Sequence, residues 1–124
     1  MADDEQALHR QVHPSWVQDG RLTSQAFSPT LKDAGLLSVY DGKQIAAEPS
    51  FIHYTTVQKL VAFGTVSVTA DEVAAVGLSW RLDPEPFPEH AVVDYTGLPT
   101  PGKIKAKAQA LAERARQRGW TYLP

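Results

Sequence analysis

The sequence predicts an α+β fold, with a mixed or mostly antiparallel sheet, two to three helices, and the C-terminal helix packed on one face of the sheet. Three observations lead to this expectation. Short runs such as Leu78–Leu82 and His90–Tyr95 carry apolar residues at every second position, as half-buried strands do. The run Lys103–Arg118 repeats its apolar residues at helical spacing instead. Ahead of these runs, Thr69-Ala-Asp-Glu72 matches the capping box that begins a helix.

Size and composition are typical of one globular domain. The chain has 124 residues, so we expect a single domain over 1–124, with residues 1–6 as a mobile acidic tail. A net charge of -2 gives no overall attraction to nucleic acid or to an anionic membrane. Cysteine is absent, which excludes disulfides, thiol nucleophiles and thiolate metal sites. No apolar run approaches the length of a membrane span, and we therefore expect a soluble, cytoplasmic protein.

The first third of the chain reads as a set of short strands. Ala7–Val12 fits either a strand or a helical turn. Arg21–Phe27 and Leu36–Tyr40 alternate like strands, and Pro29, Lys32, Asp33 and Gly35 between them predict a connection of hairpin type. Small hydroxyl residues on both runs either line a shallow polar groove or face water.

The middle of the chain alternates helices and strands. Pro49-Ser50 predicts a helix start, and the apolar residues that follow it at helical spacing are Phe51, Tyr54, Val57 and Val61. Phe63–Val68 reads as a strand, and the capping box predicts a short helix that ends at Gly77. Three prolines in the segment 83–88 predict an extended surface loop, because proline lacks a backbone donor.

The C-terminal helix is the clearest element. Its narrow apolar face consists of Ile104, Ala108, Leu111 and Ala115. Gly119 stands where a helix commonly ends, and Trp120 and Tyr122 are expected in a short final strand. Beside the apolar face runs a basic stripe of Lys103, Lys107, Arg114 and Arg118. This stripe fits a solvated helix face or, as the less favoured alternative, contact with nucleic acid or an acidic partner.

Motifs for the common chemistries are missing. The histidines do not form an HExxH or HxH pattern, so we predict no metal site. No serine lies in a GxSxG elbow or an SxxK pair, and the sequence therefore gives no ground for choosing a Ser-His-Asp set. Phosphate-binding loops of the GxGxxG and GxxxxGK[ST] types are also absent.

One ordered set of polar residues is similar to a known family. Arg10 on the first expected strand, Gly20-Arg21 followed by Ser24, the run Ser38-Val-Tyr40-Asp-Gly, and Glu48 after two alanines resemble the order in RES-type ADP-ribosyltransferase-like toxins. The resemblance covers roughly the first 50 residues, and Leu22-Thr23 stand where that family has tryptophan and asparagine. It implies a nucleotide pocket for NAD, with Arg10 binding the diphosphate and Ser24, Tyr40 and Glu48 as further catalytic candidates.

Two functions therefore remain open. The leading expectation is a binding protein or complex subunit without its own catalytic activity and without a cofactor, whose partner is another protein or a second copy. Phe87, held between Pro86 and Pro88, is either its interface anchor or a ring that covers the edge of the domain's own core, and Ser38 and Arg21 are further expected binding residues. The alternative is a small RES-type enzyme that acts on NAD or a related nucleotide. Neither function involves a membrane.

Overall fold

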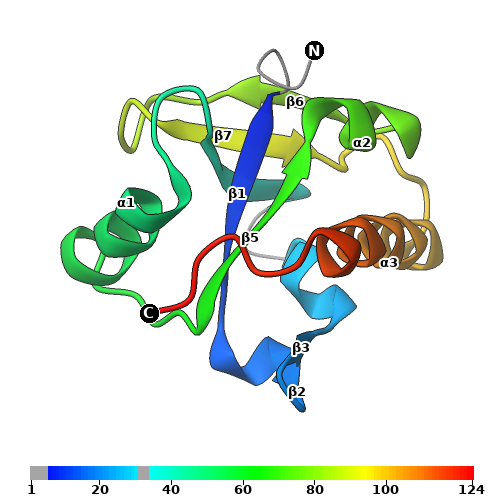
Figure 1. Cartoon of the computed structure of the whole chain (residues 1–124). Helices are drawn as coiled ribbons and strands as arrows, with labels where there is room; N and C mark the ends of the chain where they lie inside the picture. The colour runs from blue at the N-terminus through cyan, green and yellow to red at the C-terminus, as the bar shows by residue number, and fades with distance from the viewer. Residues whose placement is uncertain (1–5, 31–33) are drawn as a thin grey trace.

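The predicted α+β class with an antiparallel sheet is confirmed by the computed structural model, which describes residues 6–30 and 34–124. Five strands pair in the order β5-β1-β4-β7-β6, and every pairing is antiparallel (Figure 1). The strands are β1 (Ala7–Val12), β4 (Leu36–Asp41), β5 (Gly64–Thr69), β6 (Ser79–Leu82) and β7 (His90–Asp94). A separate two-stranded ribbon consists of β2 (Val17–Gln18) and β3 (Arg21–Leu22).

The described residues also form three α-helices, two 3-10 turns and one π-helical turn. The α-helices are α1 (Ala47–Ile52), α2 (Ala70–Ala75) and α3 (Pro101–Arg118). The 3-10 turns are η2 (Pro14–Trp16) and η3 (Ser24–Phe27), and the π-helical turn η5 (His53–Val57) continues α1. No described helix is long and apolar enough to cross a membrane.

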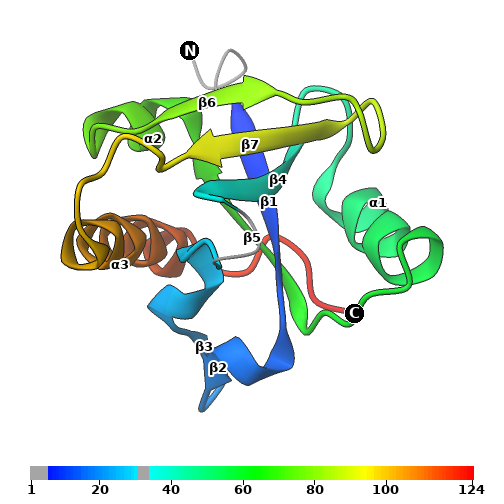
Figure 2. The ribbon, with the colours of Figure 1, turned by 180° about the vertical axis from the view of Figure 1, so that it is seen from behind.

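The sheet divides into two parts that share very little pairing. β1 pairs with β5 along its whole length, from Ala7↔Thr69 to Val12↔Gly64. With β4 it pairs only at Leu8↔Asp41 and His9↔Tyr40. Figures 1 and 2 show the consequence, since β1 and β5 run across the direction of β6 and β7. Beyond His9 the backbones of β1 and β4 diverge, and this divergence positions the cleft described below.

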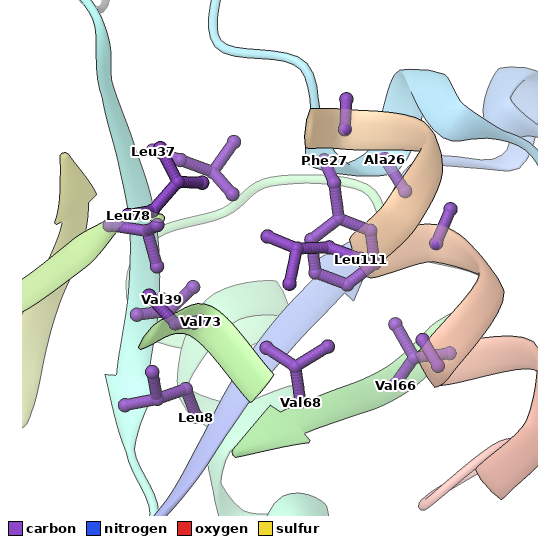
Figure 3. Packing of buried hydrophobic residues seen from close by; sticks show 14 of the residues in the cluster. Leu8, Ala26, Phe27, Leu37, Val39, Val66, Val68, Val73, Leu78 and Leu111 are labelled. Carbon is purple, nitrogen blue, oxygen red and sulfur yellow. The ribbon is translucent and has the colours of Figure 1, made fainter. Parts of the chain in front are cut away.

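One face of the sheet carries the hydrophobic core. Leu8 and Val12 of β1 lie on this face, together with Val66 and Val68 of β5, and all four are fully buried (Figure 3). The helices α2 and α3 and the turn η3 cover them. On α3 the predicted apolar face is the packing face: Ala108, Leu111 and Ala115 are fully buried, and Ile104 packs at the edge of the core.

The opposite face of β1 and β5 is buried but polar. Gln11 Nε2 donates to Ser50 Oγ of α1 over 2.8 Å, and Thr65 Oγ1 donates to Gln11 Oε1 over 2.6 Å. His9 Nδ1 lies 2.7 Å from Ser67 Oγ. Burial lowers the pKa of His9, which favours a neutral ring at this position. These paired polar groups satisfy one another, so this face tolerates burial without apolar side chains.

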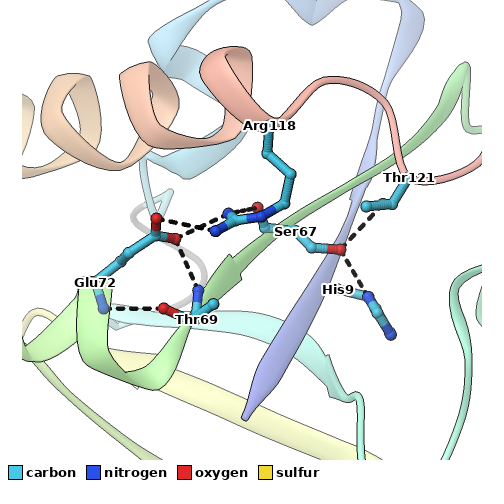
Figure 4. A network of polar contacts seen from close by, with 6 residues as sticks. All are labelled: His9, Ser67, Thr69, Glu72, Arg118 and Thr121. Carbon is cyan, nitrogen blue, oxygen red and sulfur yellow. Dashed lines mark hydrogen bonds and ion pairs between the residues drawn. The ribbon is translucent and has the colours of Figure 1, made fainter. Parts of the chain in front are cut away.

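A polar network joins α2, the end of α3 and the C-terminal segment to β5 (Figure 4). The predicted capping box is present, because Thr69 Oγ1 accepts from Glu72 N and Glu72 Oε1 accepts from Thr69 N. Arg118 donates to both carboxylate oxygens of Glu72, over 2.9 and 3.0 Å, and to the backbone oxygen of Ser67. Thr121 Oγ1 lies 3.0 Å from Ser67 Oγ.

The strand predicted for Arg21–Phe27 is wrong beyond its first two residues. Only Arg21–Leu22 is extended, and Ser24–Phe27 form the 3-10 turn η3. This turn places Ala26 and the neighbouring Phe27 together in the core, which alternating strand positions do not allow. The predicted hairpin is wrong as well, since β3 pairs with β2 while β4 pairs with β1 and β7. Lys32 and Asp33 of that connection lie outside the described residues.

Two other element boundaries differ from the expectation. The helix expected to continue past Val57 to Val61 ends in the π-helical turn η5, and both valines are largely exposed. The expected final strand is reduced to an isolated bridge between Thr65 and Tyr122.

Candidate functional site

A cleft of about 830 Å³ opens where β1 and β4 diverge. Its walls come from β1, β4, the turn η2, the segment from η5 to Leu60, and the loop between β6 and β7. Figure 2 shows α1 and the loop between β6 and β7 at the same end of the molecule, and the rings of His53 and Phe87 join them with centroids 4.5 Å apart. The missing ladder between β1 and β4 thus leaves an open cleft lined by side chains of several elements.

Arg10 bridges the gap between the diverging strands. It follows His9, the last residue of β1 that pairs with β4. From Arg10 onward the two backbones no longer bond to each other, and the guanidinium of Arg10 reaches across to β4 instead. Nε donates to the Ala26 oxygen over 2.6 Å, and one terminal nitrogen donates to the Ser38 oxygen over 2.8 Å. The guanidinium carbon lies 5.2 Å from the ring centroid of Trp16, within range of a cation–π contact. These contacts hold a positive charge at the wall of the cleft.

An aromatic cluster forms the opposite wall. The ring of Tyr40 stacks on Phe87, with centroids 5.1 Å apart, and meets His53 edge-on at 5.6 Å. Phe87 also meets His90 edge-on at 5.3 Å. Tyr54 lines the cleft beside this cluster. Tyr40 is only 4 % exposed, so the half-buried rings of Phe87 and Tyr54 supply most of the apolar surface that this wall offers to a ligand.

The hydroxyl of Tyr40 points to His53, whose Nδ1 lies 2.8 Å away. Burial raises the pKa of Tyr40 well above its ordinary value, and the neighbouring charges of Tyr54 and Glu89 raise it further. Tyr40 therefore stays a neutral phenol near neutral pH, and it is a hydrogen-bonding group of the wall rather than an anion.

A serine and a histidine lie side by side on the floor of the cleft. Ser38 Oγ is 3.1 Å from His90 Nε2. His90 Nδ1 is 2.8 Å from the backbone oxygen of Asp83 and 3.4 Å from its carboxylate. Because a carbonyl oxygen only accepts, Nδ1 carries the hydrogen, and in the neutral ring Nε2 is the acceptor for the Ser38 hydroxyl.

The structure brings some of the sequence-predicted residues together and separates others. Arg10, Ser38, Tyr40 and Phe87 all line the cleft. Ser24 and Arg21 instead line a separate depression of about 560 Å³ beside α3. Glu48 is exposed in the first turn of α1 and lines neither hollow. The set Arg10, Ser24, Tyr40 and Glu48 is therefore not assembled at one site.

The ring of Phe87 packs against other residues of this chain, although its place between two prolines predicts an exposed ring. It is half-buried, and it contacts the rings of Tyr40, His53 and His90. The pairing of β4 with β7 places Tyr40 opposite His90, so the preceding loop folds back over Tyr40. Trp16 and His90 also line the cleft and were missed as site residues, because no local motif marks them. The pairing of β4 with β7 brings His90 there, and the turn η2 brings Trp16.

The basic stripe of α3 is partly engaged within the fold. Arg118 binds Glu72 and the backbone of Ser67. Lys103 and Arg114 remain exposed, and Lys107 is half-buried near Gly77. The stripe is thus less continuous as a phosphate-binding surface than its sequence spacing indicates.

Comparisons with models of protein families, with curated proteins and with solved structures found no match. The similarity to RES-type toxins accordingly rests on the residues quoted above, of which Arg10, Ser38 and Tyr40 meet in one cleft.

Proposed function

We propose that this chain is a binding protein for a small molecule that carries a planar ring and a negatively charged group, a nucleotide-like ligand such as NAD. The observation that supports it is the meeting of the Arg10 guanidinium with the stacked Tyr40–Phe87 pair in one cleft. The ring of the ligand would lie on the aromatic wall, and its charged group would meet Arg10.

The dimensions and lining of the cleft suit this kind of ligand. Sites for small molecules typically have volumes of about 300–1,000 Å³ and few polar groups among apolar ones. Arg10 is the one arginine among the described residues that line the cleft, and no carboxylate lines it in that part of the chain. A planar guanidinium matches the oxygens of a phosphate or carboxylate in pairs, which a lysine does not.

The same observations give less support to a protein partner or to self-association through Phe87. That expectation required a ring presented to solvent on an extended loop. The ring is instead stacked within its own chain, where it forms a wall of the cleft. A small molecule that enters between Phe87 and Arg10 uses this arrangement without unfolding the loop.

Titration calorimetry with NAD, ADP-ribose and AMP tests the proposal, with Arg10→Lys as the informative variant. The lysine keeps a positive charge but loses the guanidinium bonds to the Ala26 and Ser38 oxygens that hold this charge at the cleft, so we expect about tenfold weaker binding. Arg21→Lys is the matched control, because Arg21 lines the separate depression and should leave the affinity unchanged. Thermal melts of both variants confirm that they are folded. No heat at millimolar ligand, or equal affinities of Arg10→Lys and wild type, would contradict the proposal.

A second candidate is ADP-ribosyl transfer from NAD, and the shared location of Arg10 and Tyr40 favours it. Such a reaction benefits from a carboxylate that stabilises the positive charge developing on the ribose. Glu48, the carboxylate that the resemblance indicates, lies outside the cleft, and binding is therefore the better-supported function. Release of nicotinamide from NAD, lost in both Arg10→Lys and Glu48→Gln, would support the enzyme. Binding of NAD without release would support the binding protein.

A further inference from the structure

A different chemistry is built into the floor of the cleft. Ser38 and His90 lie on neighbouring strands, and the register that pairs Tyr40 with His90 makes Ser38 a diagonal neighbour of His90 on the same face. Their side chains are in hydrogen-bond contact, with Ser38 Oγ 3.1 Å from His90 Nε2. On the other side of the ring stands Asp83, whose backbone nitrogen also donates to the His90 oxygen over 2.9 Å. The three residues follow the order nucleophile, base and orienting group.

We propose that Ser38, His90 and Asp83 form a catalytic set that hydrolyses carboxylic esters bound in the cleft. This activity goes beyond the proposed binding of a nucleotide-like ligand and does not depend on it. No sequence motif marks the set, because such constellations are defined by geometry and not by position in the chain.

Access and rigidity both fit these roles. Ser38 is exposed to the cleft, whereas His90 is only 8 % exposed, so the nucleophile is open to substrate and the base is protected. Both residues lie within regular strands whose ladder runs from Leu36↔Asp94 to Tyr40↔His90. The bond from Nδ1 to the Asp83 oxygen fixes the tautomer, which leaves Nε2 to accept the serine proton.

A positive charge stands beside the nucleophile. Arg10 donates to the backbone oxygen of Ser38 itself, over 2.8 Å, so its guanidinium lies against the residue that would attack. The tetrahedral intermediate of acyl transfer carries a negative oxygen, and a cation already held in place stabilises that oxygen. Arg10 is thus positioned to stabilise the negative oxygen of the tetrahedral intermediate.

The reaction is balanced without any cofactor. Ser38 Oγ attacks the ester carbonyl carbon while its proton passes to His90 Nε2, and the carbonyl electrons move to oxygen. When the intermediate collapses, the bond to the alcohol oxygen breaks and the alcohol takes the proton from His90. Water then attacks the acyl carbon while His90 Nε2 takes its proton. When this second intermediate collapses, the bond between the acyl carbon and Ser38 Oγ breaks, Oγ takes the proton back from His90, and a carboxylic acid leaves. The sum is ester plus water giving acid plus alcohol.

The lining of the cleft indicates the class of ester. The half-buried rings of Tyr54 and Phe87 offer apolar surface in the cleft that Ser38 lines, Tyr40 supports Phe87 from behind, and Leu60 adds an aliphatic surface. An ester with an aromatic acyl or alcohol group fits these surfaces better than a highly charged one. Aryl esters are therefore the substrates to use.

Labelling with a fluorophosphonate probe, followed by peptide mass mapping, tests the nucleophile directly. We expect an adduct on Ser38, and we expect Ser38→Ala to lower kcat/KM for p-nitrophenyl acetate by at least about 100-fold. Ser24→Ala, a change in the separate depression, is the matched control and should retain wild-type turnover. An adduct elsewhere, no adduct, or wild-type turnover by Ser38→Ala would overturn the proposal.

A second variant tests the base without requiring turnover. The chain has no cysteine, so Ser38→Cys introduces a single thiol at the nucleophile position. If His90 accepts its proton, iodoacetamide should alkylate this thiol at least about tenfold faster than in the double variant with His90→Gln. Equal rates would remove His90 from the mechanism.

The role of Asp83 as a positioning residue has its own readout. Asp83→Asn keeps the backbone oxygen that holds Nδ1 and removes only the carboxylate, so it should lower kcat while KM stays unchanged. An unchanged kcat would exclude the carboxylate from catalysis. Because none of these assays contains a nucleotide, a failure to bind NAD would leave their results interpretable.

Discussion

The ring of Tyr40 stacks on the ring of Phe87, with the two planes inclined by 28°. Tyr40 is the β4 residue that pairs with both neighbouring strands, with His9 of β1 and with His90 of β7, and Phe87 belongs to the loop that leads into β7. Their contact therefore joins the point where the sheet divides to the loop that closes the cleft. The pair thus forms part of the wall of the cleft that the missing β1–β4 pairing opens.

Replacing Phe87 by alanine should lower stability without changing the oligomeric state. Each aromatic pair contributes about 0.5–1.5 kcal/mol beyond burial, and Phe87 has three ring neighbours, so a measurable fall in melting temperature is expected. Thermal melts and sedimentation at several concentrations check both parts. Phe87→Leu keeps apolar volume and should retain more of the stability. An unchanged melting temperature together with lost self-association would show that the ring serves an interface instead.

Truncating Leu111 tests the packing of α3 on the sheet. Its side chain is fully buried between α3 and the core, so Leu111→Ala should cost about 2–5 kcal/mol in the free energy of unfolding. Leu82→Ala is the matched control, because Leu82 on β6 is 51 % exposed and should change stability by no more than about 0.5 kcal/mol. Urea unfolding followed by tryptophan fluorescence measures both. Similar losses in the two variants would argue against this packing.

The Glu72–Arg118 ion pair should make stability depend on pH in the acidic range. Burial raises the pKa of Glu72, but the bonds from Arg118 and from the Thr69 backbone outweigh burial, and the folded-state pKa lies below its ordinary value of 4.5. Stability from this group is therefore present above the unfolded pKa and is lost as the pH falls through the folded one. Glu72→Gln still completes the capping box but loses the charge. We expect it to cost about 1 kcal/mol at pH 7, and progressively less as the pH falls below 4.5 and through the folded-state pKa.

A second glutamate provides the comparison for that experiment. Glu113 pairs with Arg116 on the surface of α3, where its side chain is 56 % exposed. Such pairs within one helix contribute about 0.3–0.5 kcal/mol, so Glu113→Gln should show a smaller loss at pH 7. If both variants behave alike at each pH, the network of Figure 4 contributes no more than an ordinary surface pair.

Local signals in the sequence were sufficient for the elements that local physics determines. The capping box at Thr69 and the apolar face of the C-terminal helix appear as expected. The runs of β6 and β7 are strands, but their expected half-buried alternation is wrong, because β7 is buried on both faces and Leu82 of β6 is exposed. The segment 24–27 was misread because its apolar residues serve a turn that packs on α3, and alternation alone does not separate the two cases. Tertiary packing decided the conformation there.

The candidate site was only partly accessible to sequence reasoning. Arg10, Ser38 and Tyr40 were selected from one stretch of chain, but the partners that give them a chemical role come from far away. His90 is 52 residues from Ser38, and the register of β4 with β7 alone determines that they meet. The cleft itself results from the missing backbone pairing between β1 and β4 beyond His9. No pattern of residue types in the sequence indicates where two paired strands separate.

The buried hydroxyl of Tyr95 should make stability fall in alkali. It donates to the Phe27 oxygen, and burial raises the pKa of Tyr95 well above its ordinary value of 10, against a smaller opposing effect of Arg10. A raised folded-state pKa means that stability is complete below about pH 10 and is lost as the pH rises further, because only the unfolded chain ionises there. One such tyrosine gives a slope of about 1.4 kcal/mol per pH unit.

Tyr95→Phe separates the hydrogen bond from the ionisation. At pH 7 the variant leaves the Phe27 oxygen without this donor and should be less stable by about 1–3 kcal/mol. Above pH 10 its stability should fall less steeply than that of the wild type, so the difference between the two proteins shrinks. Urea unfolding at pH 7, 10 and 11 measures this trend, with Tyr122→Phe near the C-terminus as the control at pH 7. A difference that stays constant from pH 7 to 11 would mean that Tyr95 ionises equally in the folded and unfolded chains, which its 1 % exposure contradicts.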